Sequence, residues 1–222
     1  MTADKRSENH NRMSSQLQAI ISAERLEKYL KAGGFKIDRA LDLYAWNMKL
    51  SAAFVPLFSA AEICLRNLMV ARISEVFGTN WWENSEFLLL LGGKGKGIVK
   101  RAENKILKKN NPLDSGRMTA ELSFGFWGNM LLPKYSEALW SDMHIVFPDL
   151  SAGLDQVAMY DRCEEIRELR NRISHHEPIF TREITKDYAT CLELIQWLSA
   201  VKAKWIKPHC EVMAVVRQRP KK

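Results

Sequence analysis

Apolar residues recur every three or four positions over most of this 222-residue chain, and this spacing is the feature that most constrains its fold. The clearest runs are Leu41, Tyr44, Met48 and Ala52, and later Leu192, Ile195, Leu198 and Val201. Such spacing places apolar side chains on one face of an α-helix, whereas β-strands alternate apolar and polar residues. No convincing alternation occurs, so the sequence predicts an all-α helical bundle with an N-terminal helical extension.

Capping and helix-breaking residues predict where the first helices begin and end. Ser22 can cap a helix over residues 23–31, which Gly33–Gly34 would end. Asp38 can cap the next helix, and Pro56 is expected to kink or divide it. The helical pattern resumes after Pro56 and stops at Gly78.

Later in the chain, glycine and proline again separate the predicted helices. The run "GGKGKG" at 92–97 predicts a flexible loop, which leads into a basic helix over about 98–109. Three further helices are expected over about 118–131, 154–175 and 186–207.

The length of the chain suits one large domain. The sequence predicts a disordered segment over residues 1–20, a single all-α domain over 21–207 with a motif helix at about 154–177, and a basic tail over 208–222. The first twenty residues are polar and lack the pattern of a secretory signal, and we expect no stretch of roughly 18 apolar residues that could span a membrane. These features predict a cytoplasmic protein with no membrane partner.

The formal net charge of +7 is concentrated in two places. Residues 94–109 hold seven basic residues and one acid, Glu103, and residues 217–222 hold four basic residues and no acid. A localised basic surface suits a polyanionic partner, although a solvated helix face and a disordered tail would have the same composition. Charge alone also suits a DNA-binding regulator, but no clear helix-turn-helix pattern is present. The candidate RNA-binding residues are Lys94, Lys96, Lys100, Arg101, Lys105 and Arg172.

The segment "LRNRISHHEPIF" at 169–180 gathers groups that can move protons and hold anions. Arg170, Asn171 and His175 are the catalytic candidates. Histidine suits proton transfer because its unperturbed pKa of about 6.5 lies near working pH. Arginine holds phosphate through bidentate hydrogen bonds, and asparagine can orient the histidine or hold a phosphate oxygen. RNA supplies its own nucleophile, the 2′-OH, so this chemistry needs no metal and we expect no cofactor.

Helical geometry complicates this site. Asn171 and His175 are four residues apart and share a helix face, whereas Arg170 and His175 lie about 140° apart around the axis. Arg170 falls within the apolar stripe and needs a partner, for which Glu62, four residues before Arg66, is the candidate. Either the helix loosens before Pro178, or a second subunit brings its own pair to the same groove.

Structural explanations compete with the catalytic ones. Arg170 can be a buried structural arginine, and His175 can be a charge favoured by the helix dipole. His176 is the alternative base, and Glu177 is expected to cap the helix or to pair with a neighbour. Glu62, Arg66, His176 and Glu177 are therefore possible supporting residues rather than primary ones.

Residues 169–180 resemble the C-terminal signature of Abi-like (abortive infection) bacterial proteins, a branch of the HEPN superfamily. Further similar blocks follow the order of that family: "EICLRN" at 62–67, "FGTNWW" at 77–82 and "AELSFGFWGNML" at 120–131. The resemblance implies a bundle of HEPN type whose R-x4-H motif, from Arg170 to His175, is intact.

That motif implies a metal-independent endoribonuclease that arrests growth as a toxin in phage defence and acts as a homodimer. An antitoxin protein or an inhibitory RNA would keep such a toxin inactive. The alternative is a non-catalytic HEPN module that binds RNA or a protein partner.

Overall fold

The computed structural model describes residues 13–221, and every regular element in this range is a helix. The predicted all-α fold class is therefore confirmed. Contacts divide the chain into two compact units. Among the described residues, unit 1 comprises 13–55, 171–185 and 210–221, and unit 2 comprises 56–170 and 186–209. The helices α3 (Ile37–Phe77), α9 (Gln156–Ser174) and α10 (Ile184–Leu198) contribute residues to both units.

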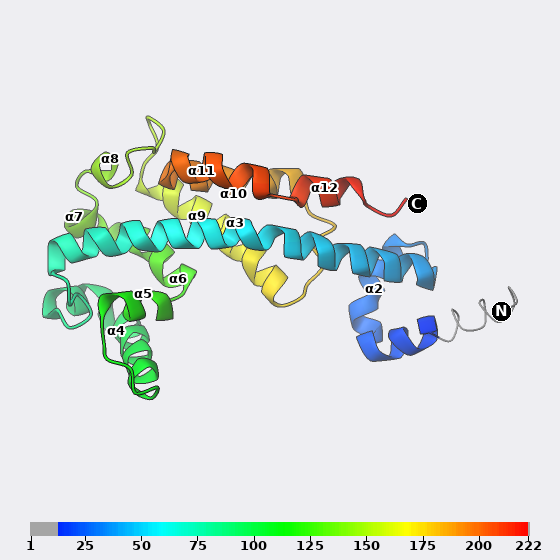
Figure 1. Ribbon diagram of the computed structural model, residues 1–222, viewed down its shortest axis with the longest axis horizontal. Coiled ribbons are helices and arrows are strands. Elements are labelled where there is room, and N and C mark those ends of the chain that lie inside the picture. The colour runs from blue at the N-terminus through cyan, green and yellow to red at the C-terminus, as the bar shows by residue number, and fades with distance from the viewer. Residues whose placement is uncertain (1–12, 222) are drawn as a thin grey trace, which may run out of the picture. The chain divides into compact units, whose positions relative to one another are not determined.

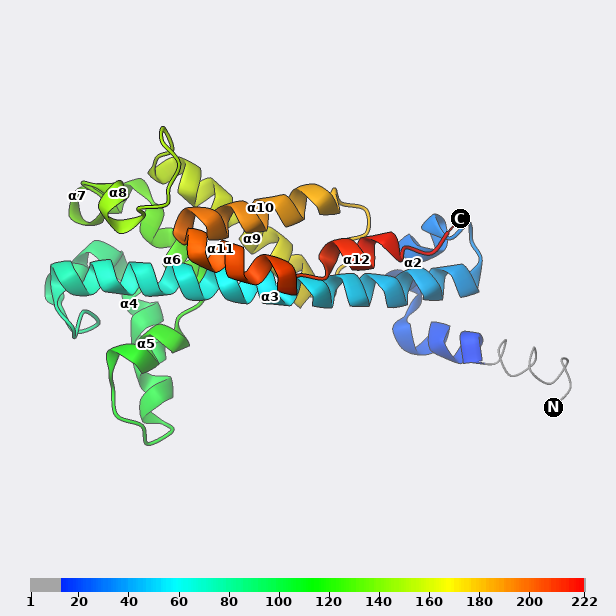
Figure 2. The same ribbon diagram turned by 45° about the horizontal axis from the view of Figure 1, so that its top comes forward.

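Unit 1 is built on α2 (Ala23–Ala32), the first part of α3 and α12 (Val212–Arg217). Ser22 caps α2, as predicted, by accepting a hydrogen bond from the backbone N–H of Arg25. The Trp46 indole Nε1 donates to the Val215 carbonyl oxygen at 2.7 Å, so α12 lies along α3 (Figure 2). Val212 and Val215 of α12 are buried. The predicted basic tail over 208–222 therefore contains a helix that is packed into the core of unit 1.

The N-terminal prediction requires two corrections. Residues 13–21 are helical, so the disorder predicted through residue 20 is wrong for 13–20, while residues 1–12 lie outside the described residues. Asp38 does not cap α3, because the helix begins one residue earlier at Ile37. The Asp38 carboxylate lies in the first turn and accepts a hydrogen bond from the Ser14 hydroxyl at 2.9 Å, where its negative charge favours the helix N-terminus.

Helix α3 continues through Pro56, so of the two predicted effects of this proline, a kink or a division, the division does not occur. Buried residues on both sides, among them Phe54 and Leu57, favour a continuous helix despite the lost backbone donor. By length and composition α3 could cross a membrane, although no membrane-spanning stretch was expected from the sequence. Of its most apolar 18-residue window, 33% is buried. The helix ends at Phe77, before Gly78 with φ +90°, as predicted.

Unit 2 contains the last part of α3, the helices within residues 85–146, α9 up to Arg170, the greater part of α10 and the helix over residues 200–206. Its core includes the fully buried Trp81, Phe87 and Trp127. The Trp81 ring contacts each of the other two edge to face, with centroids about 6 Å apart. Arg162 on α9 forms an ion pair with Glu193 on α10 at 2.7 Å and so joins these two helices.

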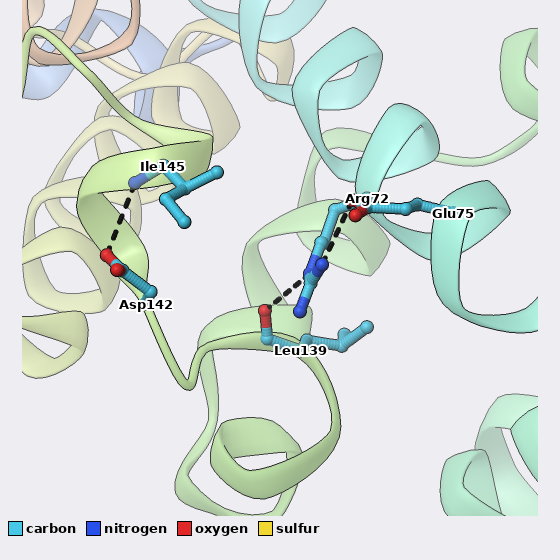
Figure 3. A network of polar contacts seen from close by, with 5 residues as sticks. All are labelled: Arg72, Glu75, Leu139, Asp142 and Ile145. Carbon is cyan, nitrogen blue, oxygen red and sulfur yellow. Dashed lines mark hydrogen bonds and ion pairs between the residues drawn. The ribbon is translucent and has the colours of Figure 1, made fainter.

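A second polar network joins α3 to α7 (Ser136–Leu139) within unit 2 (Figure 3). The Arg72 Nε donates to the Leu139 carbonyl oxygen at 2.9 Å, and its Nη1 lies 2.9 Å from a Glu75 carboxylate oxygen. Close by, the Asp142 carboxylate caps α8 (Met143–Val146) by accepting from the Ile145 N–H. These contacts hold the two short helices that follow the 3-10 turns Asn129–Leu131 and Pro133–Tyr135.

The run "GGKGKG" is helical, so the predicted loop at 92–97 is wrong. Helix α4 (Ser85–Leu107) includes these residues, with a single break at Gly92, where φ is +70°. Glycine adopts this left-handed conformation without steric cost, and the helix resumes immediately after it. The basic residues of 94–107 therefore lie on a helix, which packs beside α5 (Ser115–Glu121) (Figure 1).

Serine residues break two helices that were predicted to be continuous. Ser123 caps α6 (Phe124–Gly128) and thereby separates it from α5, within the predicted helix 118–131. Ser199 caps α11 (Ala200–Ile206) and separates it from α10, within the predicted helix 186–207; the turn Lys207–His209 follows. Both serines have extended backbone and accept a hydrogen bond from an N–H three residues later.

Candidate active site

Helix α9 ends in a hydrogen-bonded cap formed by the motif segment itself. The Glu177 N–H donates to the Arg172 carbonyl oxygen at 2.8 Å, and the His176 N–H donates to the Ile173 carbonyl oxygen at 3.0 Å. His176 has φ +55°, the left-handed conformation that glycine usually supplies at this position. The pair of bonds is the Schellman arrangement, which fixes the direction in which the chain leaves α9.

The helix keeps its α-helical hydrogen bonding as far as His175. The His175 N–H donates to the Asn171 carbonyl oxygen, four residues earlier, at 2.9 Å. The predicted loosening before Pro178 therefore begins only after His175 and does not turn that residue around the axis. Asn171 and His175 consequently lie one turn apart on the same side of the helix.

Two side chains that the sequence analysis did not identify hold the segment after the cap within unit 1. The buried Asn47 Oδ1 accepts hydrogen bonds from the backbone N–H groups of Ile179 and Phe180, at 2.9 and 3.2 Å. The Arg25 Nη1 donates to the His176 carbonyl oxygen at 2.6 Å. Asn47 and Arg25 are more than 130 residues away from their partners, so no local pattern indicates these contacts.

The imidazole of His175 is accessible to an external group. His175 and His176 are exposed, and Asn171 is half-buried. Among residues 13–221, no hydrogen bond or ion pair involves the side chain of Asn171 or His175. A polar side chain held in place by its backbone, and not engaged by its neighbours, can exchange a proton with a substrate.

Glu177 forms an ion pair with Arg172, which is one of the two roles predicted for it; the other was to cap the helix. Their charged atoms are 3.4 Å apart, and both side chains are partly exposed. The same two residues also form one of the two backbone hydrogen bonds of the cap at the end of α9, so their ion pair adds a side-chain contact that holds the motif segment. Arg172, which the sequence analysis considered for RNA binding, has a carboxylate beside it and is less available to a phosphate.

In unit 2, Arg170 lies beside Glu62, the partner that the sequence analysis expected. The Arg170 Nη2 is 4.0 Å from the Glu62 Oε2. The Arg170 side chain is 40% exposed, so it is not a buried structural arginine. A single long contact leaves most of the guanidinium donors open to an anion. The division between the two units falls directly after Arg170, before Asn171.

Arg66 lies one turn after Glu62 on α3. It is half-buried, and its Nε is buried without a hydrogen-bond partner in the described chain. Of the two arginines proposed as neighbours of Glu62, Arg66 on its own helix and Arg170 on α9, the one that forms the ion pair is Arg170.

The basic residues of α4 are all exposed. Lys100 pairs with Glu103 at 2.6 Å, and Lys105 pairs with Glu121 of α5. Lys94, Lys96 and Arg101 have no carboxylate partner within residues 13–221. Helical spacing places one set of basic residues on a single face, which we call the basic face of α4: Lys94, Arg101, Lys105 and Lys108.

The cysteines offer little nucleophilic character. Burial raises the pKa of the Cys163 thiol far above its ordinary value, and burial also raises the pKa of Cys64 and Cys210. A thiol with a raised pKa is protonated at neutral pH and reacts poorly. Within residues 13–221, no three His, Cys, Asp or Glu side chains are grouped as metal ligands would be.

Comparisons with protein-family models, with curated proteins and with solved structures found no match to this chain.

Proposed function

We propose that this chain is a metal-independent endoribonuclease of the HEPN type, in which Arg170, Asn171 and His175 carry the reaction. The observation that supports it most is the state of His175: an exposed imidazole, not engaged by its neighbours, on a helix end that a backbone cap and Asn47 hold in place.

The proposed reaction uses the 2′-OH of RNA as its nucleophile. One imidazole removes the 2′-OH proton, and the oxygen attacks the adjacent phosphorus. The Arg170 guanidinium donates hydrogen bonds to the non-bridging oxygens, where negative charge develops, and the Asn171 amide holds one of them or orients the histidine. An imidazolium returns a proton to the leaving 5′-oxygen. The products are a 2′,3′-cyclic phosphate and a 5′-OH, and DNA is not cleaved because it lacks the 2′-OH.

A homodimer completes the proposed site. Positions five residues apart on an α-helix are separated by about 140°, and α-helical hydrogen bonding reaches His175. One phosphodiester can therefore meet the arginine of one subunit and the histidine of the other more easily than both groups of one helix. Two histidines at a shared site would also supply the base and the acid as separate groups.

The basic face of α4 is the proposed RNA-docking surface. Its four cations lie within residues 94–108, and the fourteen steps between the first and the last correspond to about 21 Å of helix. Such a row can follow the phosphates of one strand and give a salt-dependent affinity without reading sequence. The pairing of Lys105 with Glu121 reduces its contribution, which leaves Lys94, Arg101 and Lys108 as the main contacts.

The cellular role follows from the resemblance of residues 169–180 and the earlier blocks to Abi-like proteins. We propose a cytoplasmic toxin that stops growth during phage infection by cleaving RNA, and that an antitoxin protein or an inhibitory RNA keeps inactive.

The test compares three proteins incubated with structured and unstructured RNA in EDTA: wild type, His175→Ala and His144→Ala. His144 is also exposed, and it lies on α8, so it controls for the loss of a surface histidine. We expect cleavage by wild type and His144→Ala, and a loss of at least about a hundredfold in His175→Ala. Equal cleavage by all three proteins would contradict the assignment of His175.

The non-catalytic alternative has one observation in its favour, the ion pair between Arg170 and Glu62. If that pair is structural, Arg170→Ala lowers the thermal midpoint of unfolding and the RNA stays intact with every variant. If the proposal holds, Arg170→Ala abolishes cleavage with little change in the midpoint, because its side chain is 40% exposed.

A further inference from the structure

Unit 1 contains a cavity of about 700 Å³ whose charged lining residues are all basic. Lys31 contributes from the end of α2 and Arg39 from the first turns of α3. Arg219 and Lys221 contribute from the segment after α12. These four cations come from positions up to 190 residues apart, so the fold and not a local sequence run brings them together.

The C-terminal part of this cavity is held in place by specific contacts. The Trp46 Nε1 bond to the Val215 carbonyl oxygen anchors α12, and the Arg219 N–H continues the turn by donating to the Val216 carbonyl oxygen at 3.2 Å. The Arg219 guanidinium then lies over the Trp46 ring, 5.3 Å from its centroid. This cation–π contact orients the side chain without neutralising its charge.

The positive charge around the cavity is largely uncompensated. Within residues 13–221, no carboxylate forms an ion pair with Arg39, Arg219 or Lys221. Lys31 pairs with Glu27, but both side chains are about 60% exposed, so water screens that pair. The like charges around the cavity repel one another, and a bound anion would attract each of them and so offset that repulsion.

The geometry points to a phosphate-bearing small molecule of nucleotide size as the ligand of this cavity. Its volume lies within the range of about 300–1,000 Å³ that is typical of small-molecule sites. Arg39 and Arg219 provide planar forks that suit phosphate oxygens. The buried Leu43 and the neighbouring Pro220 provide an apolar wall for the organic part of the ligand. Gly34, with φ +65°, leaves the adjoining rim without a side chain.

This site is separate from the proposed RNA cleavage, because none of its lining residues belongs to the motif segment or to the basic face of α4. A ligand held here would bridge α2, α3 and the C-terminal segment and would stabilise unit 1 by binding the folded state alone.

Calorimetric titration of the full chain with ATP, pyrophosphate, inorganic phosphate and adenosine tests the proposal. We expect ATP to bind at least about tenfold more tightly than pyrophosphate, because only ATP also contacts the apolar wall, and we expect no binding of adenosine. Arg39→Gln and Arg219→Gln should each weaken ATP binding by about tenfold, as the loss of a charge-assisted contact requires.

Lys36→Gln and Arg217→Gln are the matched controls, because each removes one positive charge from the same segment at a residue outside the cavity. They should change the dissociation constant by less than about twofold, and Arg219→Lys should recover part of the affinity. Any of three results would overturn the proposal. The control variants could weaken ATP binding as much as the cavity variants do, pyrophosphate could bind as tightly as ATP, or single-stranded RNA could bind while ATP does not. The thermal midpoint of each variant identifies any loss of folding, and Arg39→Gln and Arg219→Gln test the same site from two separate segments.

Discussion

Asn47 is the residue whose replacement tests most directly how the motif segment is positioned. Only 4% of its surface is exposed, and its Oδ1 accepts two backbone hydrogen bonds from the segment that follows α9. Asn47→Ala would leave the N–H groups of Ile179 and Phe180, which are also buried, without their acceptor. An unsatisfied buried donor costs about 1–3 kcal/mol.

Two such donors would cost about 2–6 kcal/mol, and the better helix propensity of alanine would return about 0.6 kcal/mol. We therefore expect the free energy of unfolding to fall by about 1.4–5.4 kcal/mol, measured by urea denaturation. Asn67→Ala is the matched control, because Asn67 is exposed on the same helix and should show only the small gain from helix propensity.

Hydrogen exchange gives the site-specific reading of the same change. The amides of Ile179 and Phe180 should lose protection in Asn47→Ala, while the amides of the α3 interior keep theirs. RNA cleavage should also fall, although Asn47 touches no substrate, because the segment holding the α9 cap would loosen. A loss of stability below about 0.5 kcal/mol, with unchanged exchange at Ile179 and Phe180, would refute this account of the segment.

Three further predictions concern unit 1. Burial, with a smaller effect of Tyr44, raises the pKa of Tyr29 to about 12, so the unfolded chain releases this proton at a lower pH than the folded chain. The free energy of unfolding should therefore keep its full value below pH 10 and fall by about 2 kcal/mol between pH 10 and 12. In parallel urea titrations, Tyr29→Phe should lack this decrease. His176→Gly should raise the free energy of unfolding by about 0.5–1 kcal/mol by relieving φ +55°, and cleavage that survives the change would show that His176 is not the base. Trp46→Phe should cost about 1 kcal/mol and increase proteolysis after Arg217 by removing the bond to Val215, whereas unchanged proteolysis would mean that this bond does not hold the C-terminal segment.

Two features that act within one helix were predicted correctly from the sequence, although the cap expected at Asp38 was not. Ser22 caps α2 and Gly78 follows the last residue of α3, because capping and helix termination depend on neighbours within a few positions. One contact between helices was also predicted, that of Glu62 on α3 with Arg170 on α9, because an arginine in an apolar stripe requires a carboxylate.

Two predictions from local helix-breaking residues failed because tertiary packing outweighs them. Pro56 and Gly93–Gly97 usually interrupt helices, but α3 and α4 continue through them, apart from the break at Gly92. In α4, Leu91, Val99 and Ala102 are buried in unit 2, and this packing exceeds the cost of the glycines. Asn47 could not be identified from the sequence, because its partners are 132 and 133 residues away.

Sequencing of RNA 5′-OH ends after induced expression tests the central claim, that His175 and Arg170 act on the ribose–phosphate linkage, most directly. Wild type and His144→Ala should produce new 5′-OH ends with matching 2′,3′-cyclic phosphates, and His175→Ala and Arg170→Ala should produce none. Co-expression of His175→Ala with Arg170→Ala should restore part of the signal, since a mixed dimer keeps one intact pair. The same 5′-OH ends in all variants, or in none of them, would contradict the account.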